Sequence, residues 1–255
     1  MSDAHVHRAA RLGPFIALQL QFADRMAELT GAARGEMALR HTNLHRRIGF
    51  GVNLPEQDGA PGWEVLATAL NTERDLAARV ALCQAACASN PPEAIPHAGQ
   101  AGFGCFACDP PDAQGVVRIH FFNADTDAAG GPLASGKMAR RRAELAALTR
   151  HVLETHPQAT TIRGKSWLYN LEAYRRLFPS DYAGSRHVWT GSLHLTGTSS
   201  WGQVIDSHER VRADVANALL ANLPALNPER PWMAFPLRVL ATEAPVASFA
   251  AEYGL

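Results

Sequence analysis

The residue pattern with the clearest chemical meaning is a short glycine-bearing segment at residues 131–137, which reads Gly-Pro-Leu-Ala-Ser-Gly-Lys. This spacing is typical of phosphate-binding loops, in which backbone amides surround phosphate oxygens and the lysine reaches the outer phosphate. Met138 stands where a hydroxyl side chain would hold magnesium, and Pro132 has no amide hydrogen, so we do not expect a nucleoside triphosphatase. A glycine-bearing loop before a helix can still bind a pyrophosphate, because a helix N-terminus favours negative charge. Lys137 and the arginines at 140–142 add positive charge there, unless they form a solvent-exposed helix face.

His120 is a polar residue inside an otherwise apolar predicted strand, Val116–Phe122. A polar side chain in such a strand is either held by hydrogen bonds or placed there for chemistry. Imidazole exchanges a proton near neutral pH, so His120 is a candidate general base, with a hydrogen-bonded structural histidine as the alternative. Covalent catalysis is disfavoured, because the segment 197–202 does not have the spacing of a nucleophile elbow.

The cysteines of the chain suggest a second kind of chemistry, a zinc site made by Cys83, Cys87, Cys105 and Cys108. The first pair is four residues apart on a predicted helix, and the second pair is a C-x-x-C. The second pair lies in a predicted strand, where its side chains would point to opposite faces. Core packing is therefore the favoured interpretation of these cysteines, and zinc binding the alternative.

The elements before residue 100 are predicted to be helical. Apolar residues recur at three- and four-residue spacing over residues 8–85, starting with Phe15, Leu18 and Phe22. Residues 51–62 are rich in glycine, proline, asparagine and aspartate and predict a loop, and the proline-rich segment 89–102 ends the helical region.

From about residue 103 the pattern becomes one of strands and helices in alternation. Two short apolar runs at 103–108 and 116–122 predict a hairpin, and a glycine-rich loop follows at 123–132. The remaining predicted elements are a helix over 134–156, a strand over 160–167, a short helix over 171–178, a strand over 186–195, a helix from Ser199 or Ser200 to about Leu223, a strand over 235–242 and a C-terminal helix from Val246.

Length and composition limit the class of protein. The chain has 255 residues, of which 47% are hydrophobic and 19% charged, as expected for a globular protein with one main core. Lysine and arginine together number 24, as do aspartate and glutamate, so no overall positive charge favours nucleic acid or an anionic membrane. The N-terminus lacks a run of signal-peptide type, and no stretch approaches about 18 apolar residues, so we expect a cytoplasmic protein with reduced cysteines.

The order of predicted elements from residue 103 onward is similar to the core of the GNAT-type N-acyltransferases. The segment Asn170-Leu-Glu-Ala173-Tyr174, with Phe178 after it, resembles an Asn-x-x-Ala segment followed by a tyrosine and an aromatic residue in that family. The strand end Ser166-Trp-Leu resembles a largely uncharacterised set of bacterial acyltransferase-like proteins. The resemblance covers roughly residues 100–245.

The resemblance implies an α/β fold with a mixed central sheet flanked by helices over residues 96–255. The apolar spacing before it predicts a helical region over 1–95, which we expect to pack on this core. It implies transfer of an acyl group from acyl-CoA to an amine of a small molecule or peptide, without a covalent enzyme intermediate. The loop at 129–136 would hold the pyrophosphate of coenzyme A, and no metal is expected. The implied site residues are Gly130, Gly131, Gly136 and Lys137 for the cofactor, Tyr174 as acid with Tyr169 in reserve, and His120 as base. The alternative is a non-catalytic ligand- or zinc-binding protein on the same fold.

Overall fold

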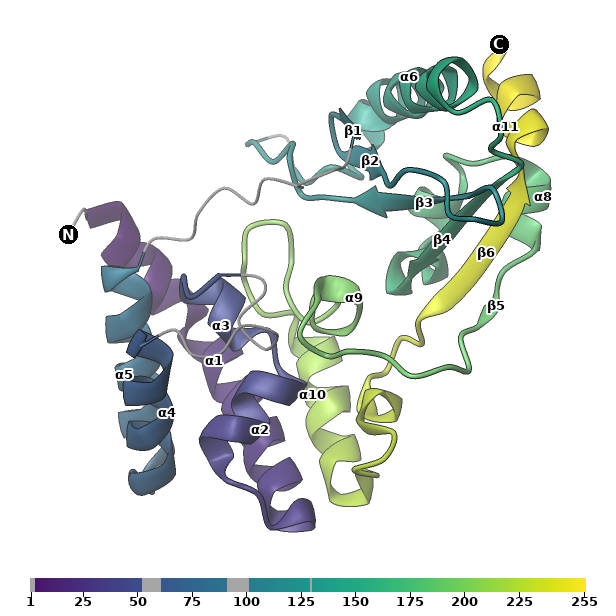
Figure 1. Ribbon diagram of the computed structural model, residues 1–255. Helices are drawn as coiled ribbons and strands as arrows, with labels where there is room; N and C mark the ends of the chain where they lie inside the picture. The colour runs from purple at the N-terminus through teal and green to yellow at the C-terminus, as the bar shows by residue number, and fades with distance from the viewer. Residues whose placement is uncertain (1–2, 52–60, 91–100, 129) are drawn as a thin grey trace. The chain divides into compact units, whose positions relative to one another are not determined.

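Figure 1 shows a computed structural model of the chain, which describes residues 3–51, 61–90, 101–128 and 130–255. The predicted loops at 51–62 and 89–102 fall largely outside these residues. The chain divides into two compact units, each made of two segments: unit 1 comprises 1–95 with 191–236, and unit 2 comprises 96–190 with 237–255. We expected a boundary near residue 95 and one continuous core after it. The structure instead assigns 191–236 to the unit of the N-terminal helices.

Unit 1 is helical and is organised around Trp201. The indole ring contacts Phe15, Phe22 and Phe235 edge-on, with centroid distances of 6.0, 5.3 and 4.9 Å. Its Nε1 donates to the carbonyl of His41 at 3.1 Å, so this large buried side chain is also satisfied as a donor. The helices of the unit are α1 (Asp3–Thr30), α2 (Arg34–His41), α3 (Leu44–Arg47), α4 (Pro61–Thr72), α5 (Leu76–Ser89), α9 (Thr198–Trp201) and α10 (Ala213–Asn222), with 3₁₀ turns η4 (Leu223–Ala225) and η5 (Pro231–Ala234).

The single helix predicted from Ser199 to Leu223 is wrong, because a turn separates α9 from α10. The carboxylate of Asp206 accepts from the backbone amides of His208 and Arg210 at 2.8 and 2.9 Å. Such side-chain acceptors compete with the helical hydrogen bonds of the backbone. Glu209 in this turn has a φ of 61°, which a helix cannot contain.

Unit 2 is built on a mixed six-stranded sheet with the order β1-β2-β3-β4-β6-β5, which confirms the expected α/β class. Strands β3 and β4 are parallel and all other neighbours are antiparallel. The strands are β1 (Ala101–Phe103), β2 (Phe106–Cys108), β3 (Val116–Phe121), β4 (Thr161–Ser166), β5 (His187–Val188) and β6 (Leu240–Pro245). The predicted 186–195 strand is shortened to β5. The crossover between β3 and β4 runs through the turn η2 (Ser135–Lys137) and the helix α6 (Met138–Thr155), as parallel neighbours require.

One face of this sheet, here called the core face, carries the hydrophobic core of unit 2. Val117 and Ile119 of β3 and Ile162 of β4 belong to it, together with apolar residues of α6 and α11 (Val246–Tyr253), which lie side by side (Figure 1). The tyrosines come from η3 (Trp167–Asn170), α7 (Glu172–Arg175) and α8 (Ser180–Gly184). Strand residues alternate between faces, so the opposite face, here called the polar face, carries Arg118, His120, Arg163, Lys165 and Glu243.

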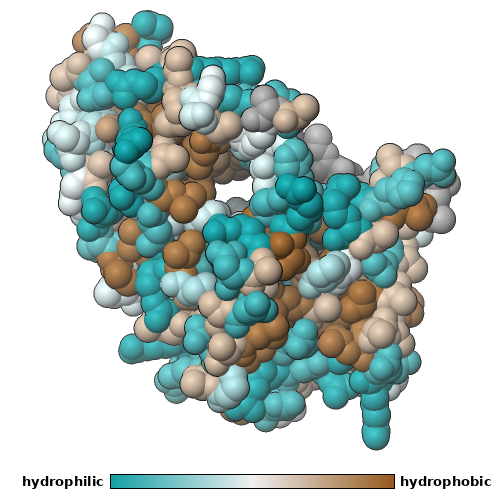
Figure 2. Space-filling model, turned by 180° about the vertical axis from the view of Figure 1, so that it is seen from behind, coloured by the Kyte–Doolittle hydropathy of each residue, from teal (hydrophilic) through white to brown (hydrophobic). Residues whose placement is uncertain are grey.

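Figure 2 shows hydrophobic residues interspersed among hydrophilic ones on the surface. Among the described residues, the large exposed apolar side chains include Val65 on α4, Val188 on β5 and Met233 on η5. Scattered apolar side chains of this kind are ordinary on protein surfaces. In the part of the chain that the structure describes, no helix has both the length and the hydrophobicity needed to cross a bilayer.

Candidate active site

The parallel strands β3 and β4 stop pairing before either strand ends. Their last paired residues are Ile119 and Gly164. Strand β3 goes on pairing with β2 as far as Phe121, and β4 goes on pairing with β6 as far as Ser166. The sheet therefore opens at the carboxyl ends of β3 and β4, between segments 120–121 and 165–166. Carboxyl ends of parallel strands are common ligand sites in α/β proteins.

His120 lies on the polar face at this opening and is paired with Asp109, which directly follows β2. Its Nε2 lies 2.9 Å from Oδ2 of Asp109, and its ring stacks on Phe122 at 6.3 Å with an interplanar angle of 25°. The His120 side chain is 36% exposed, so a substrate can reach it. When Nε2 donates to the carboxylate, Nδ1 retains a lone pair that can accept a proton. The strand prediction found His120, but nothing in the sequence pattern pointed to Asp109 as its partner.

Two cations that sequence reasoning missed share the polar face with His120. Arg118 precedes His120 by two residues on β3. Lys165 on β4 lies one residue beyond Gly164, the last paired residue of β4, just as His120 lies one residue beyond Ile119. The ammonium group of Lys165 lies 4.6 Å from the ring centroid of Trp189. Burial and then the positive charge of Arg118 lower the pKa of Lys165. The alternation of VVRIHF in β3 could have revealed Arg118, because it fixes which residues share a face with His120.

Tyr174 and Tyr169, the predicted general acids, lie on the core face together with Tyr182. The hydroxyls of Tyr169 and Tyr182 are 2.6 Å apart, and Tyr174 is 2% exposed. Burial, followed by the neighbouring tyrosines, raises the pKa of all three well above the usual range, so they stay protonated. The ring of Tyr174 contacts Phe121 at 5.2 Å, at the opening of the sheet. His120 and Tyr174 therefore lie on opposite faces at the same end of the sheet.

Gly164 allows the tyrosines to approach the sheet. A Cβ atom at this position would collide with the hydroxyl groups of Tyr169 and Tyr182. The glycine is needed for this close approach and not for an unusual backbone angle.

The predicted phosphate loop follows β3 and leads into α6, but Lys137 is already engaged by the chain itself. Its Nζ lies 2.9 Å from the carbonyl of Asp125, 3.1 Å from the carbonyl of Gly130 and 3.1 Å from the Asp127 carboxylate. The expectation that Lys137 is directed toward a cofactor therefore differs from its observed contacts, because two acidic residues of the same loop hold it. Ala129, the first residue of the predicted loop, lies outside the described residues.

The arginines at the start of α6 are likewise paired with carboxylates. Arg141 is fully buried and donates to Asp125 at 2.7 Å and to Glu144 at 2.8 Å. Burial alone would raise the pKa of Asp125, but Lys137, Arg140 and Arg141 together lower it. The local cations are thus neutralised by local anions, and binding of a pyrophosphate here would depend on backbone amides.

The glycines of this loop differ in what they contribute. Gly130 has a φ of 117°, a conformation that side chains disfavour. A Cβ at Gly136 would meet open space, and Gly136 does not have a positive φ. The amides of Ser135 and Gly136 begin the η2 turn and so have no intrahelical acceptor. Gly131 accepts from the amide of Ala134 at 3.1 Å.

The two cysteine pairs are divided between the two units. Cys83 and Cys87 lie on α5 of unit 1, whereas Cys105 and Cys108 belong to the β1–β2 region of unit 2, and all four are buried and unbridged. Burial raises the pKa of Cys83 to about 12 and that of Cys108 to about 11, which disfavours the thiolates that zinc requires. Among the described residues there is no group of three or more His, Cys, Asp or Glu placed to hold a metal.

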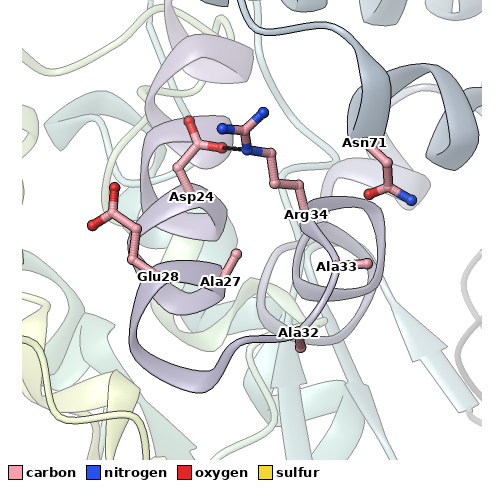
Figure 3. Close-up of a pocket in the computed structure, with 7 residues that line it drawn as sticks. All are labelled: Asp24, Ala27, Glu28, Ala32, Ala33, Arg34 and Asn71. Atoms are coloured by element: carbon pink, nitrogen blue, oxygen red, sulfur yellow. Dashed lines mark ion pairs between the residues drawn. The ribbon is translucent and has the colours of Figure 1, made fainter.

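A separate pocket of about 420 Å³ lies in unit 1, between α1, α2 and α4 (Figure 3). Arg34 points across it toward Asp24, at 3.3 Å. Asp24 also receives both terminal nitrogens of Arg79, at 2.5 and 2.7 Å, and the side-chain oxygen of Asn71 accepts from the amide of Gly35. These polar groups are used to hold α1, α2, α4 and α5 together, so we assign no ligand to this pocket.

Comparison with known proteins identifies no relative: no family model matches the chain, and neither the curated proteins nor the solved structures contain a match.

Proposed function

We propose that unit 2 is a GNAT-like acyltransferase that moves an acyl group from acyl-CoA to an amine. The observation that carries the proposal is the opening between β3 and β4, with His120 at its edge. An extended acyl-pantetheine arm would fit between two strands that no longer pair. Its amide groups could use backbone groups of 120–121 and 165–166 that the β3–β4 ladder leaves unused.

The arrangement of the two faces supports direct transfer. His120 would accept the proton that the amine loses as its nitrogen attacks the thioester carbonyl. Tyr174, held protonated on the core face near the same opening, would give its proton to the departing thiolate. The C–N bond forms as the C–S bond breaks, and no residue of the chain needs to carry the acyl group.

The order of elements also supports this proposal. The order is similar to the one that the resemblance implies. A hairpin is followed by a loop with Gly130, Gly131 and Gly136, then by the helix α6 and the parallel strand β4. Short helices and the antiparallel strands β5 and β6 come after β4. The loop and the amides at the start of η2 are the proposed contact with the pyrophosphate.

One observation favours the alternative of a non-catalytic protein on the same fold. Lys137 and Arg141 are paired with Asp125, Asp127 and Glu144, so the loop offers less free positive charge than a pyrophosphate site would use. Binding without turnover would be the outcome that this alternative predicts.

Calorimetric titration of coenzyme A into the full chain tests the site directly. We expect saturable binding that Gly131→Asp weakens by at least about tenfold, because the inserted carboxylate repels the pyrophosphate. An acetyl-CoA assay with a panel of amines, followed by chromatography of released coenzyme A, tests turnover. Absence of binding to the wild type, or equal affinity of the variant, would refute the proposed site.

A further inference from the structure

The polar face beside His120 carries two cations without a carboxylate partner. Arg118 is exposed, and among the described residues neither Arg118 nor Lys165 forms an ion pair. Arg163 on the same face is different, because its Nε donates to Glu243 at 2.7 Å. Asp109, the other acid at this place, is engaged by His120.

Register places these two cations on the same face of the sheet as the imidazole. Arg118 and His120 are alternate residues of β3, so their side chains leave the same face. Lys165 is one residue past Gly164, just as His120 is one residue past Ile119, the partner of Gly164. The ring of Trp189 packs against the Lys165 ammonium and limits where that side chain can extend.

The like charges of Arg118 and Lys165 repel one another, and an anion bound by both would offset this repulsion. Burial and then the charge of Arg118 lower the pKa of Lys165, in agreement with their placement on one face of the sheet. Each can donate charge-assisted hydrogen bonds to a carboxylate or a phosphate.

We propose that Arg118 and Lys165 bind an anionic group, a carboxylate or a phosphate, on the amine acceptor and so place its amine at His120. This inference rests on the proposed acyltransferase function for its meaning, but the anion site itself can be tested without turnover.

The chain offers an unusually direct probe, because Lys137 and Lys165 are its only lysines. Reductive methylation with ¹³C-formaldehyde keeps their positive charge and gives separate NMR signals for these two side chains and the N-terminus. Titration with N-acetylglycine, with its neutral analogue N-acetylglycinamide, and with inorganic phosphate then reports anion binding at Lys165. The Lys137 signal is an internal control, because that ammonium is enclosed by Asp125 and Asp127.

We expect a saturable shift of the Lys165 signal with N-acetylglycine or with phosphate, and the anion that binds more tightly identifies the group. The neutral analogue should give none. Arg118→Gln should weaken the binding about tenfold, the loss of one charge-assisted hydrogen bond. Arg150→Gln removes the same charge from the exposed side of α6 and should leave the affinity unchanged.

A Lys165 signal that responds to neither anion, or equally to the neutral analogue, would overturn the anion site. So would equal affinities of the Arg118 and Arg150 variants, once melting curves show both to be folded. None of these titrations contains coenzyme A, so a failed anion site and a failed acyltransferase assignment give different results.

Discussion

Nε2 of His120 lies within hydrogen-bond distance of Asp109, and Nδ1 is the nitrogen that would accept the amine proton in the proposed reaction. These two roles can be tested residue by residue. The carboxylate fixes the orientation of the ring. A structural histidine would use the same contact only to hold β3 against the residue after β2.

We expect His120→Asn to lower turnover by about 10²–10⁴-fold, because a general base acts in the transition state. Asp109→Asn should produce a smaller loss, since it leaves the imidazole in place. Melting temperature, measured on the same samples, should change little for both. His156→Asn, at the end of α6, is the matched control. A rate loss that only follows the loss of folded protein would assign His120 a structural role.

The contributions of the Tyr174 ring and of its hydroxyl can be measured separately. The ring is 2% exposed among Phe121, Tyr169 and Phe178, so Tyr174→Ala should lower the free energy of unfolding by about 3–5 kcal/mol. Tyr174→Phe keeps the ring and should cost about 1 kcal/mol. If the hydroxyl is the acid, Tyr174→Phe also lowers turnover by about 10²–10⁴-fold with unchanged affinity for coenzyme A. Wild-type turnover in this variant would remove Tyr174 from the mechanism.

At the scale of elements, the packing of β4 against the helices after it depends on the absence of a side chain at Gly164. Gly164→Ala places a methyl group against the Tyr169 and Tyr182 hydroxyls and should destabilise the protein by about 1–3 kcal/mol. Gly136→Ala is the matched control, because its methyl group meets open space at a φ that alanine adopts, and it should be neutral or stabilising by up to about 1 kcal/mol. Chemical denaturation of both variants measures the difference. Equal free energies of unfolding for the two variants would contradict the close packing of Tyr169 and Tyr182 against Gly164.

At the scale of the whole molecule, Glu209 joins residues far apart in the chain within unit 1. It accepts from Arg8 Nε and Nη2 at 2.9 and 2.8 Å and from Arg47 at 3.1 Å, and its φ of 61° is the only positive value among described non-glycine residues. Burial alone would raise its pKa, but the hydrogen bonds and charges of Arg8 and Arg47 lower it below the usual 4.5. Its ion pairs therefore tie the turn between α9 and α10 to α1 and α3.

A lowered folded-state pKa means that Glu209 stabilises the fold above pH 4.5 and loses this contribution as the pH falls through the folded value. Glu209→Gln should lower the free energy of unfolding by about 1–3 kcal/mol at pH 7 and flatten its decline on acidification. Urea denaturation between pH 7 and pH 3.5 measures both effects. Glu229→Gln, at an exposed site, should keep the wild-type pH dependence. A Glu209 variant with the wild-type slope would contradict the role of these ion pairs.

Local patterns in the sequence determined most of the elements. The spacing of Phe15 and Phe22 predicted the buried side of α1, and the alternation in 116–121 predicted a strand with His120 on it. The glycine-bearing segment before α6 was also found, since glycine and proline act on the backbone locally. The mixed α/β class follows from the same patterns.

What only the tertiary structure decided are the partners of these residues. Strand register brings Asp109 to His120 and places Lys165 on the same face of the sheet, and register depends on pairing between separate segments. Lys137 forms ion pairs with Asp125 and Asp127 because the loop folds back on itself. Residues 191–236 join unit 1 because Trp201 buries its ring against Phe15 and Phe22. Periodicity records which side chains must be buried or exposed, but contacts between distant segments are chosen by the packing and charge pairing of the whole chain.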